Sequence, residues 1–102
     1  MSRLESLERM LKQDPDDALL HYMLASEYFN AGRLSECVAL LQKYLTLAED
    51  EGAAYRTLAQ AFVRLGKIPD ARRAYEEGIR AAQKFEHPSM VAEYEETLRT
   101  LK

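Results

Sequence analysis

The stretch Leu24-Ala25-Ser26-Glu27-Tyr28-Phe29-Asn30-Ala31-Gly32 decides the fold, because its main positions return 34 residues later. Leu24, Ala25, Tyr28 and Gly32 recur as Leu58, Ala59, Phe62 and Gly66, and the match continues from Cys37 to Ala71, from Leu41 to Tyr75 and from Ala48 to Ala82. These matches fall on small, aromatic and glycine positions, where packing sets the residue type. A fixed period of this length indicates an array of structural repeats.

The composition fits a single globular or helical-repeat domain. The chain has 102 residues, of which 47% are apolar and 30% charged, and its net charge of −3 gives no general reason to bind nucleic acid or an anionic membrane. Residues 1–51 carry 5 Lys/Arg against 10 Asp/Glu, whereas residues 52–102 carry 9 against 7. One cysteine, Cys37, excludes an internal disulfide and is compatible with a reducing compartment. Because no apolar signal core follows Met1 and no run is long enough to span a membrane, we expect a cytoplasmic protein.

Apolar residues recur at helical spacing in six segments, and no segment alternates at period two. The expected helices cover residues 2–13, 18–31, about 34–48, about 53–66, 69–82 and 89–101. Glu49-Asp50-Glu51-Gly52 is expected to cap the fourth helix. Gly78 lies inside the fifth, where glycine costs about 0.5–1 kcal/mol relative to Ala, so we expect close packing against a neighbouring helix. The pattern predicts an all-α fold with short turns.

These residues resemble the motif of the tetratricopeptide repeat (TPR) family, whose antiparallel helix pairs of 34 residues stack into a right-handed superhelix. The large-then-small pairs are Leu24-Ala25 and Leu58-Ala59, the aromatics are Tyr28 and Phe62, the turn glycines are Gly32 and Gly66, and the small residues of the second helices are Cys37 and Ala71. The resemblance implies one domain over residues 1–102. Its parts are a half-repeat helix at 2–15, repeats at 18–51 and 52–85, and a capping helix at 89–101.

The resemblance also implies a partner-binding surface on the inner, concave side of each repeat's first helix. The matching positions are Leu19, Tyr22, Met23, Ser26, Phe29, Asn30, Arg56, Thr57, Gln60, Val63 and Arg64. The spacing agrees, since Tyr22, Ser26 and Asn30, like Arg56, Gln60 and Arg64, stand at i, i+4 and i+8 on one helix face. An apolar half beside a cationic half suits a peptide with an apolar anchor and an acidic side chain or C-terminal carboxylate. In the alternative interpretation, the arginines only solvate an exposed face and the aromatics pack under the first helix.

Few residues are arranged for chemistry. Cys37 occupies a small core position, and a buried thiol in apolar surroundings is inert. His21 and His87 are far apart and lack neighbouring ligands at metal-binding spacing, while Glu93, Glu95 and Glu96 are interpreted as a solvated face. We therefore expect no enzymatic activity, no metal and no cofactor.

Two hypotheses for the function remain open. In the first, the protein is an adaptor or scaffold that binds a peptide segment of another protein through the concave groove. In the second, it is a homo-oligomeric or structural subunit that uses its ends or helix faces. The acidic first half and the basic segment 52–84 would then steer a head-to-tail contact, and Val38 and Leu47 lie off the third helix's main stripe.

Overall fold

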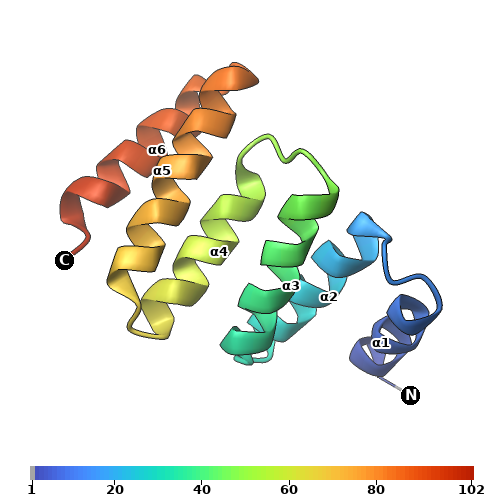
Figure 1. Ribbon diagram of the computed structural model, residues 1–102. Helices are drawn as coiled ribbons and strands as arrows, with labels where there is room; N and C mark the ends of the chain where they lie inside the picture. The colour runs from blue at the N-terminus through green and yellow to red at the C-terminus, as the bar shows by residue number, and fades with distance from the viewer. Residues whose placement is uncertain (1) are drawn as a thin grey trace. The chain divides into compact units, whose positions relative to one another are not determined.

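A computed structural model describes residues 2–102, and within them the chain forms six helices and no strand (Figure 1). The helices are α1 (Arg3–Gln13), α2 (Ala18–Asn30), α3 (Leu34–Leu47), α4 (Ala53–Arg64), α5 (Ile68–Lys84) and α6 (Pro88–Thr100). The all-α prediction is confirmed. The largest differences in the boundaries are that α4 ends two residues before Gly66 and that α5 runs on to Lys84.

Polar side chains close the first turns of three helices. The Ser2 hydroxyl accepts the amide of Glu5 at 3.1 Å, and the Glu5 side chain returns to the Ser2 backbone, so α1 begins with a capping box. Asp17 caps α2 by accepting the amide of Leu20 at 3.1 Å. Asp50 accepts the amides of Gly52 and Ala54 at 2.8 and 2.9 Å. The predicted cap of α4 is therefore confirmed, with Asp50 as the residue that makes it.

Two glycines reverse the chain between paired helices. Gly32 and Gly66 follow α2 and α4, with φ values of 77° and 78°. This left-handed conformation is unfavourable for residues that carry a Cβ, which is why glycine is common at helix C-termini. Each glycine stands in a turn of only a few residues, so α3 runs back along α2 and α5 runs back along α4.

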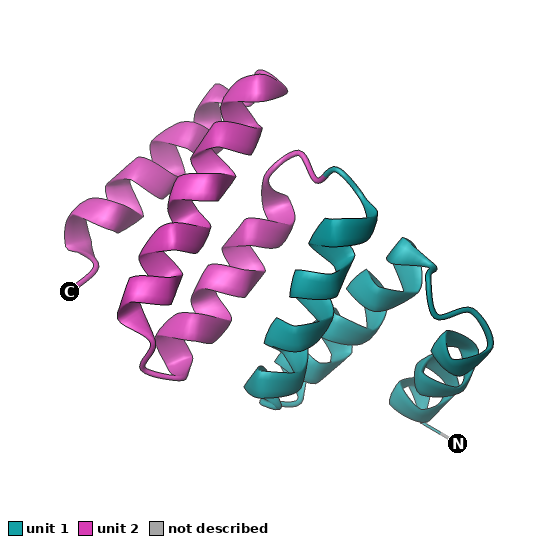
Figure 2. Cartoon of the chain, viewed as in Figure 1, with its two compact units in different colours: residues 1–49 teal, residues 50–102 magenta. Residues whose placement is uncertain are grey.

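The chain falls into two compact units, residues 1–49 and 50–102 (Figure 2). In the first unit, α2 packs against both α1 and α3. Ala25 and Cys37 have no exposed surface, as expected for small residues that let α2 and α3 approach closely. The Tyr28 hydroxyl donates to Oε2 of Glu8 at 2.5 Å and so fastens α1 to α2. The division into a half-repeat, two repeats and a capping helix stays a prediction.

In the second unit α5 packs against α4 on one side and α6 on another. Ala59 and Ala71 are fully buried, like their counterparts in the first unit. A Cβ placed on Gly78 would lie 2.8 Å from Cε2 of Tyr94 and 2.9 Å from Cβ of Tyr55. The expectation that Gly78 permits close helix packing is therefore confirmed, and α6 supplies the ring that needs the space.

Candidate partner-binding faces

Six of the predicted partner-binding residues lie on α2, in the first unit. Leu19 is the most exposed large apolar residue that the structure describes, at 65%, and Asn30 is also exposed. Tyr22, Met23, Ser26 and Phe29 are half-buried. Leu19, Met23, Ser26 and Asn30 are spaced i, i+4, i+7 and i+11, so they share one side of the helix. The opposite side holds the buried residues Leu20, Leu24, Ala25 and Tyr28.

Part of the α2 face is already engaged within its own unit. The ring of Tyr22 meets that of Tyr44 edge-on, with centroids 5.1 Å apart and planes at 61°. The Ser26 hydroxyl donates to the backbone carbonyl of Tyr22 at 3.1 Å. The exposed side chains on this face are those of Leu19, which is apolar, and Asn30, which is polar.

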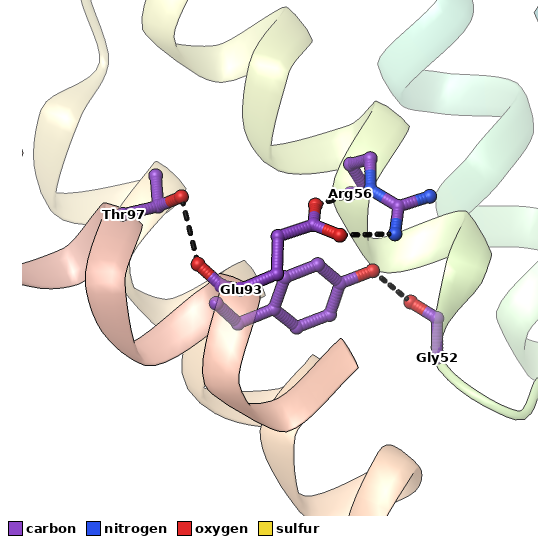
Figure 3. Close-up of polar contacts among 5 residues, drawn as sticks. Gly52, Arg56, Glu93 and Thr97 are labelled. Carbon is purple, nitrogen blue, oxygen red and sulfur yellow. Dashed lines mark hydrogen bonds and ion pairs between the residues drawn. The ribbon is translucent and has the colours of Figure 1, made fainter. Parts of the chain in front are cut away.

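The remaining predicted residues lie on α4, in the second unit, and their environment differs from the expectation. Arg56 makes a two-pronged ion pair with Glu93 of α6, with Nε 2.6 Å from Oε2 and Nη2 2.8 Å from Oε1 (Figure 3). Thr57 and Val63 are half-buried, whereas Gln60 and Arg64 are exposed. The α4 face therefore presents an arginine whose charge is already matched, rather than an open cationic face.

The ion pair lies next to a buried tyrosine, Tyr94, that is hydrogen-bonded to the backbone. Tyr94, the neighbour of Glu93, has no exposed surface, and its hydroxyl donates to the carbonyl of Gly52 at 2.7 Å. The Arg56 guanidinium lies 5.4 Å from the centroid of the Tyr94 ring, within the range of a cation–π contact. The hydrogen bond to Glu93 raises the pKa of Arg56, and burial raises the pKa of Tyr94 to about 12. Arg56 thus stays charged and Tyr94 neutral across the physiological range.

Sequence reasoning missed the role of Glu93. Glu93 is exposed, as expected for a residue of a solvated face, but that interpretation did not include the ion pair of its carboxylate with Arg56. Glu96 pairs with Arg99 on the same helix, and Glu95 is exposed. The one available signal was the separation of Arg56 and Glu93, which at 37 residues is close to one repeat. Opposite charges about one repeat apart, here on α4 and α6, are candidates for an ion pair.

A hollow of about 340 Å³ lies beside the ion pair, where α5 turns into α6. Its lining residues are Arg56, Glu86, His87, Pro88, Ser89, Met90 and Glu93. Glu86 adopts a left-handed φ of 58°, which is uncommon for a residue with a side chain. Nε2 of His87 lies 2.7 Å from Oε1 of Glu51. The hollow is therefore lined, next to Arg56, by the carboxylates of Glu86 and Glu93 and by the apolar side chains of Pro88 and Met90.

Residues suited to catalysis or metal binding are dispersed. Burial raises the pKa of the Cys37 thiol to about 11, so it is a poor nucleophile. His21 is buried at 6% exposure, with Nε2 2.8 Å from the carbonyl oxygen of Pro15, as a packing residue would be. Within residues 2–102 no three His, Cys, Asp or Glu side chains gather into a possible metal site. None of the helices in this range combines the length and apolar character that crossing a membrane requires.

Three comparisons with known proteins agree with this architecture. A family model described as tetratricopeptide repeat matches residues 4–58. The TPR repeat-containing protein PA0015 of Pseudomonas aeruginosa is 32% identical over 79 residues, which cover 78% of this chain and 75% of that protein. The solution structure of protein BPP2914 from Bordetella parapertussis has a TM-score of 0.82 and 29% identity, and the match covers 99% of this chain and 88% of that one. The family match spans more than half of the sequence, and the chain belongs to the tetratricopeptide repeat family.

Proposed function

We propose that the protein is an adaptor that binds a peptide segment of a partner protein through the exposed sides of α2 and α4. Tetratricopeptide repeat domains generally mediate protein–protein interactions, and proteins of the family are typically non-enzymatic. The finer assignment to these two helix faces is our inference, as are the cytoplasmic location and the absence of catalysis.

The observation that carries the proposal is the apolar character of α2 on both of its sides. One side is buried in the first unit, and the other carries Leu19 and Met23 together with Ser26 and Asn30. A helix that is apolar all round is normally buried on all sides. Leu19 nevertheless remains 65% exposed. A peptide with an apolar anchor would cover this side and gain the free energy of burying it.

Binding by α4 contributes polar selectivity rather than most of the affinity. Gln60 and Arg64 are exposed on α4, and the Arg56–Glu93 pair adds a position where charge is already balanced. A short helical surface offers limited area, so we expect dissociation constants of about a micromolar.

The test is selection of binders from a displayed library of random peptides, followed by affinity measurements on matched variants. Leu19→Asp places a charge on the α2 face at an exposed position, where it will scarcely affect folding. The matched control is Met10→Asp, because Met10 is the other exposed large apolar residue described, at 48%, and lies on α1.

We expect the selected peptides to lose at least tenfold in affinity for Leu19→Asp and to bind Met10→Asp like the wild type. Equal binding to all three proteins would mean that α2 is not the contact surface. Failure to enrich any peptide would count against the peptide-binding function itself.

The second candidate function is self-association, and one observation favours it. A hollow of about 450 Å³ on α5 and α6 is lined by Ala82, Gln83, Glu86, His87, Pro88, Val91, Ala92 and Glu95. Val38 is only 9% exposed, so it is poorly placed for contact with a second copy. Sedimentation at several concentrations decides the matter, since a monomer throughout would exclude this candidate.

A further inference from the structure

The hollow of about 450 Å³ on α5 and α6 has an apolar lining that is open to solvent. Ala82 has no exposed surface, Val91 is half-buried, and Pro88 and Ala92 are exposed beside them. α5 and α6 pack against each other in the second unit, so the hollow is formed between two neighbouring helices (Figure 1). Its volume lies in the range of sites that hold a ligand. A side chain from another molecule can therefore bury apolar surface here.

Two carboxylates, those of Glu86 and Glu95, complete the lining and decide its charge. Both residues are exposed, and neither forms an ion pair with another residue in the part of the chain that the structure describes. Two neighbouring basic side chains are engaged elsewhere, since His87 lies against Glu51 and Arg99 pairs with Glu96. The N-terminus of α6 adds roughly half a positive charge, which two carboxylates outweigh. The hollow is therefore negative and disfavours an acidic ligand.

The backbone of Glu86 agrees with a use for its side chain. Its φ of 58° is left-handed, and within residues 2–102 it is the only residue other than glycine with a positive φ. Glycine adopts this conformation without the steric penalty that a side chain carries. Backbone strain of this kind is concentrated at functional sites. A glutamate at a position that favours glycine thus supports a role for the carboxylate beside the hollow.

We propose that this hollow binds an arginine or lysine side chain presented by a peptide segment of a partner protein. The aliphatic part of such a side chain covers the apolar lining, and its charged end meets the carboxylates of Glu86 and Glu95. A second copy docked through the same hollow would bring like charges together, whereas a basic segment is complementary. The inference goes beyond the proposed function, because the hollow lies on α5 and α6 and not on the faces of α2 and α4.

The experiment uses two blocked dipeptides as probes, N-acetyl-leucyl-arginine amide and its neutral isostere N-acetyl-leucyl-citrulline amide. Backbone amide signals are followed by NMR during titration at constant ionic strength. The proteins are the wild type, the double variant Glu86→Gln with Glu95→Gln, and Glu76→Gln. Glu76 is the matched control, because it is an exposed carboxylate of α5 that does not line the hollow. Replacing exposed glutamates by glutamine scarcely affects folding.

We expect the arginine probe to bind the wild type with a dissociation constant on the order of a millimolar, because a single side chain anchors it. The amides of Gln83, Val91 and Ala92 should shift most, since these residues line the hollow. The double variant should bind this probe about fivefold more weakly, which is the factor for losing two exposed ionic contacts. Glu76→Gln should differ from the wild type by less than about twofold, and the citrulline probe should bind the wild type about fivefold more weakly than the arginine probe.

Equal binding of the arginine and citrulline probes would overturn the proposal, as would equal affinities of the double variant and Glu76→Gln. The absence of a saturable shift with the arginine probe would overturn it as well. Shifts around the hollow that depend on protein concentration without any probe would identify a second copy as the occupant, which also contradicts the proposal.

The variant Leu19→Asp separates this inference from the proposed function. We expect it to bind the arginine probe like the wild type, because Leu19 belongs to α2 in the first unit. Loss of probe binding in Leu19→Asp would place the probe on α2, which would overturn this inference and leave the proposed function intact. Failure of the random library to enrich any peptide would count against the proposed function, whereas the probe would still bind at the hollow.

Discussion

Gly78→Ala is the sharpest test of how α6 is held on α5. In an ordinary helix interior this change stabilises a protein by about 0.5–1 kcal/mol, because alanine has the higher helix propensity. Here the added Cβ would approach Cε2 of Tyr94 to 2.8 Å and Cβ of Tyr55 to 2.9 Å. Carbon atoms in contact normally stay about 3.5–4.0 Å apart, so one of these neighbours must move.

Neither neighbour moves cheaply. The ring of Tyr94 is fully buried and tethered to the carbonyl of Gly52, and the Cβ of Tyr55 is fixed to the backbone of α4. Overpacking of this kind costs about 1–3 kcal/mol, and weakening the hydrogen bond adds about 0.5–1.5 kcal/mol. After subtracting the propensity gain, these terms leave a net loss of about 0.5–4 kcal/mol, and we expect about 2 kcal/mol.

The assay is urea denaturation followed by circular dichroism, supported by thermal melting. A loss of about 2 kcal/mol corresponds to a fall in melting temperature of about 10 °C for a domain of this size. Glu76→Ala is the control, because Glu76 is an exposed residue of the same helix and its replacement should change stability by less than about 0.5 kcal/mol. A Gly78→Ala protein as stable as the wild type would refute the close approach of Tyr94 to this glycine.

Three further predictions concern the second unit. Ala59→Leu should lower the free energy of unfolding by about 1–3 kcal/mol in urea, because Ala59 has no exposed surface in the α4–α5 contact. Tyr94→Phe should lower it by about 1–2 kcal/mol by leaving the Gly52 carbonyl unpaired. Folding raises the pKa of Tyr94 from its ordinary value of about 10 to about 12. The wild type should therefore lose stability as the pH rises from about 10 to about 12, and Tyr94→Phe should lose less. Denaturation measured at pH values below and above this range will test the difference. Glu86→Gly should raise the free energy of unfolding by up to about 1 kcal/mol, because glycine adopts the left-handed φ of 58° without a Cβ penalty. The increase should appear as a higher melting temperature.

The features that could be predicted from sequence are those set by local rules. The period of 34 residues identified the paired helices, and Gly32 and Gly66 take the left-handed φ that their turns require. Gly78 was also informative, because glycine is unfavourable inside a helix unless a neighbour packs too closely to allow a Cβ. The ring of Tyr94 is that neighbour.

The Arg56–Glu93 pair could not be predicted because it joins residues on different helices. Helical spacing tells which side of α4 carries Arg56, but the rotation of α6 that brings Glu93 to it follows from the burial of Tyr94. Tyr22 is a similar case. The i, i+4, i+8 spacing placed it on an open face, whereas the Tyr44 ring packs against it from α3. Periodicity assigns a residue to a face and does not reveal what covers that face.

The most direct test of the account is amide chemical-shift mapping with a peptide selected from the random library. If the peptide binds through α2 and α4, the largest shifts will fall on α2 between Leu19 and Asn30 and on α4 between Arg56 and Arg64, and α3 and α5 will change little. Shifts concentrated on α3, on α5 or around the hollow of about 450 Å³ on α5 and α6 would contradict binding through α2 and α4, because the peptide would then bind outside the proposed faces.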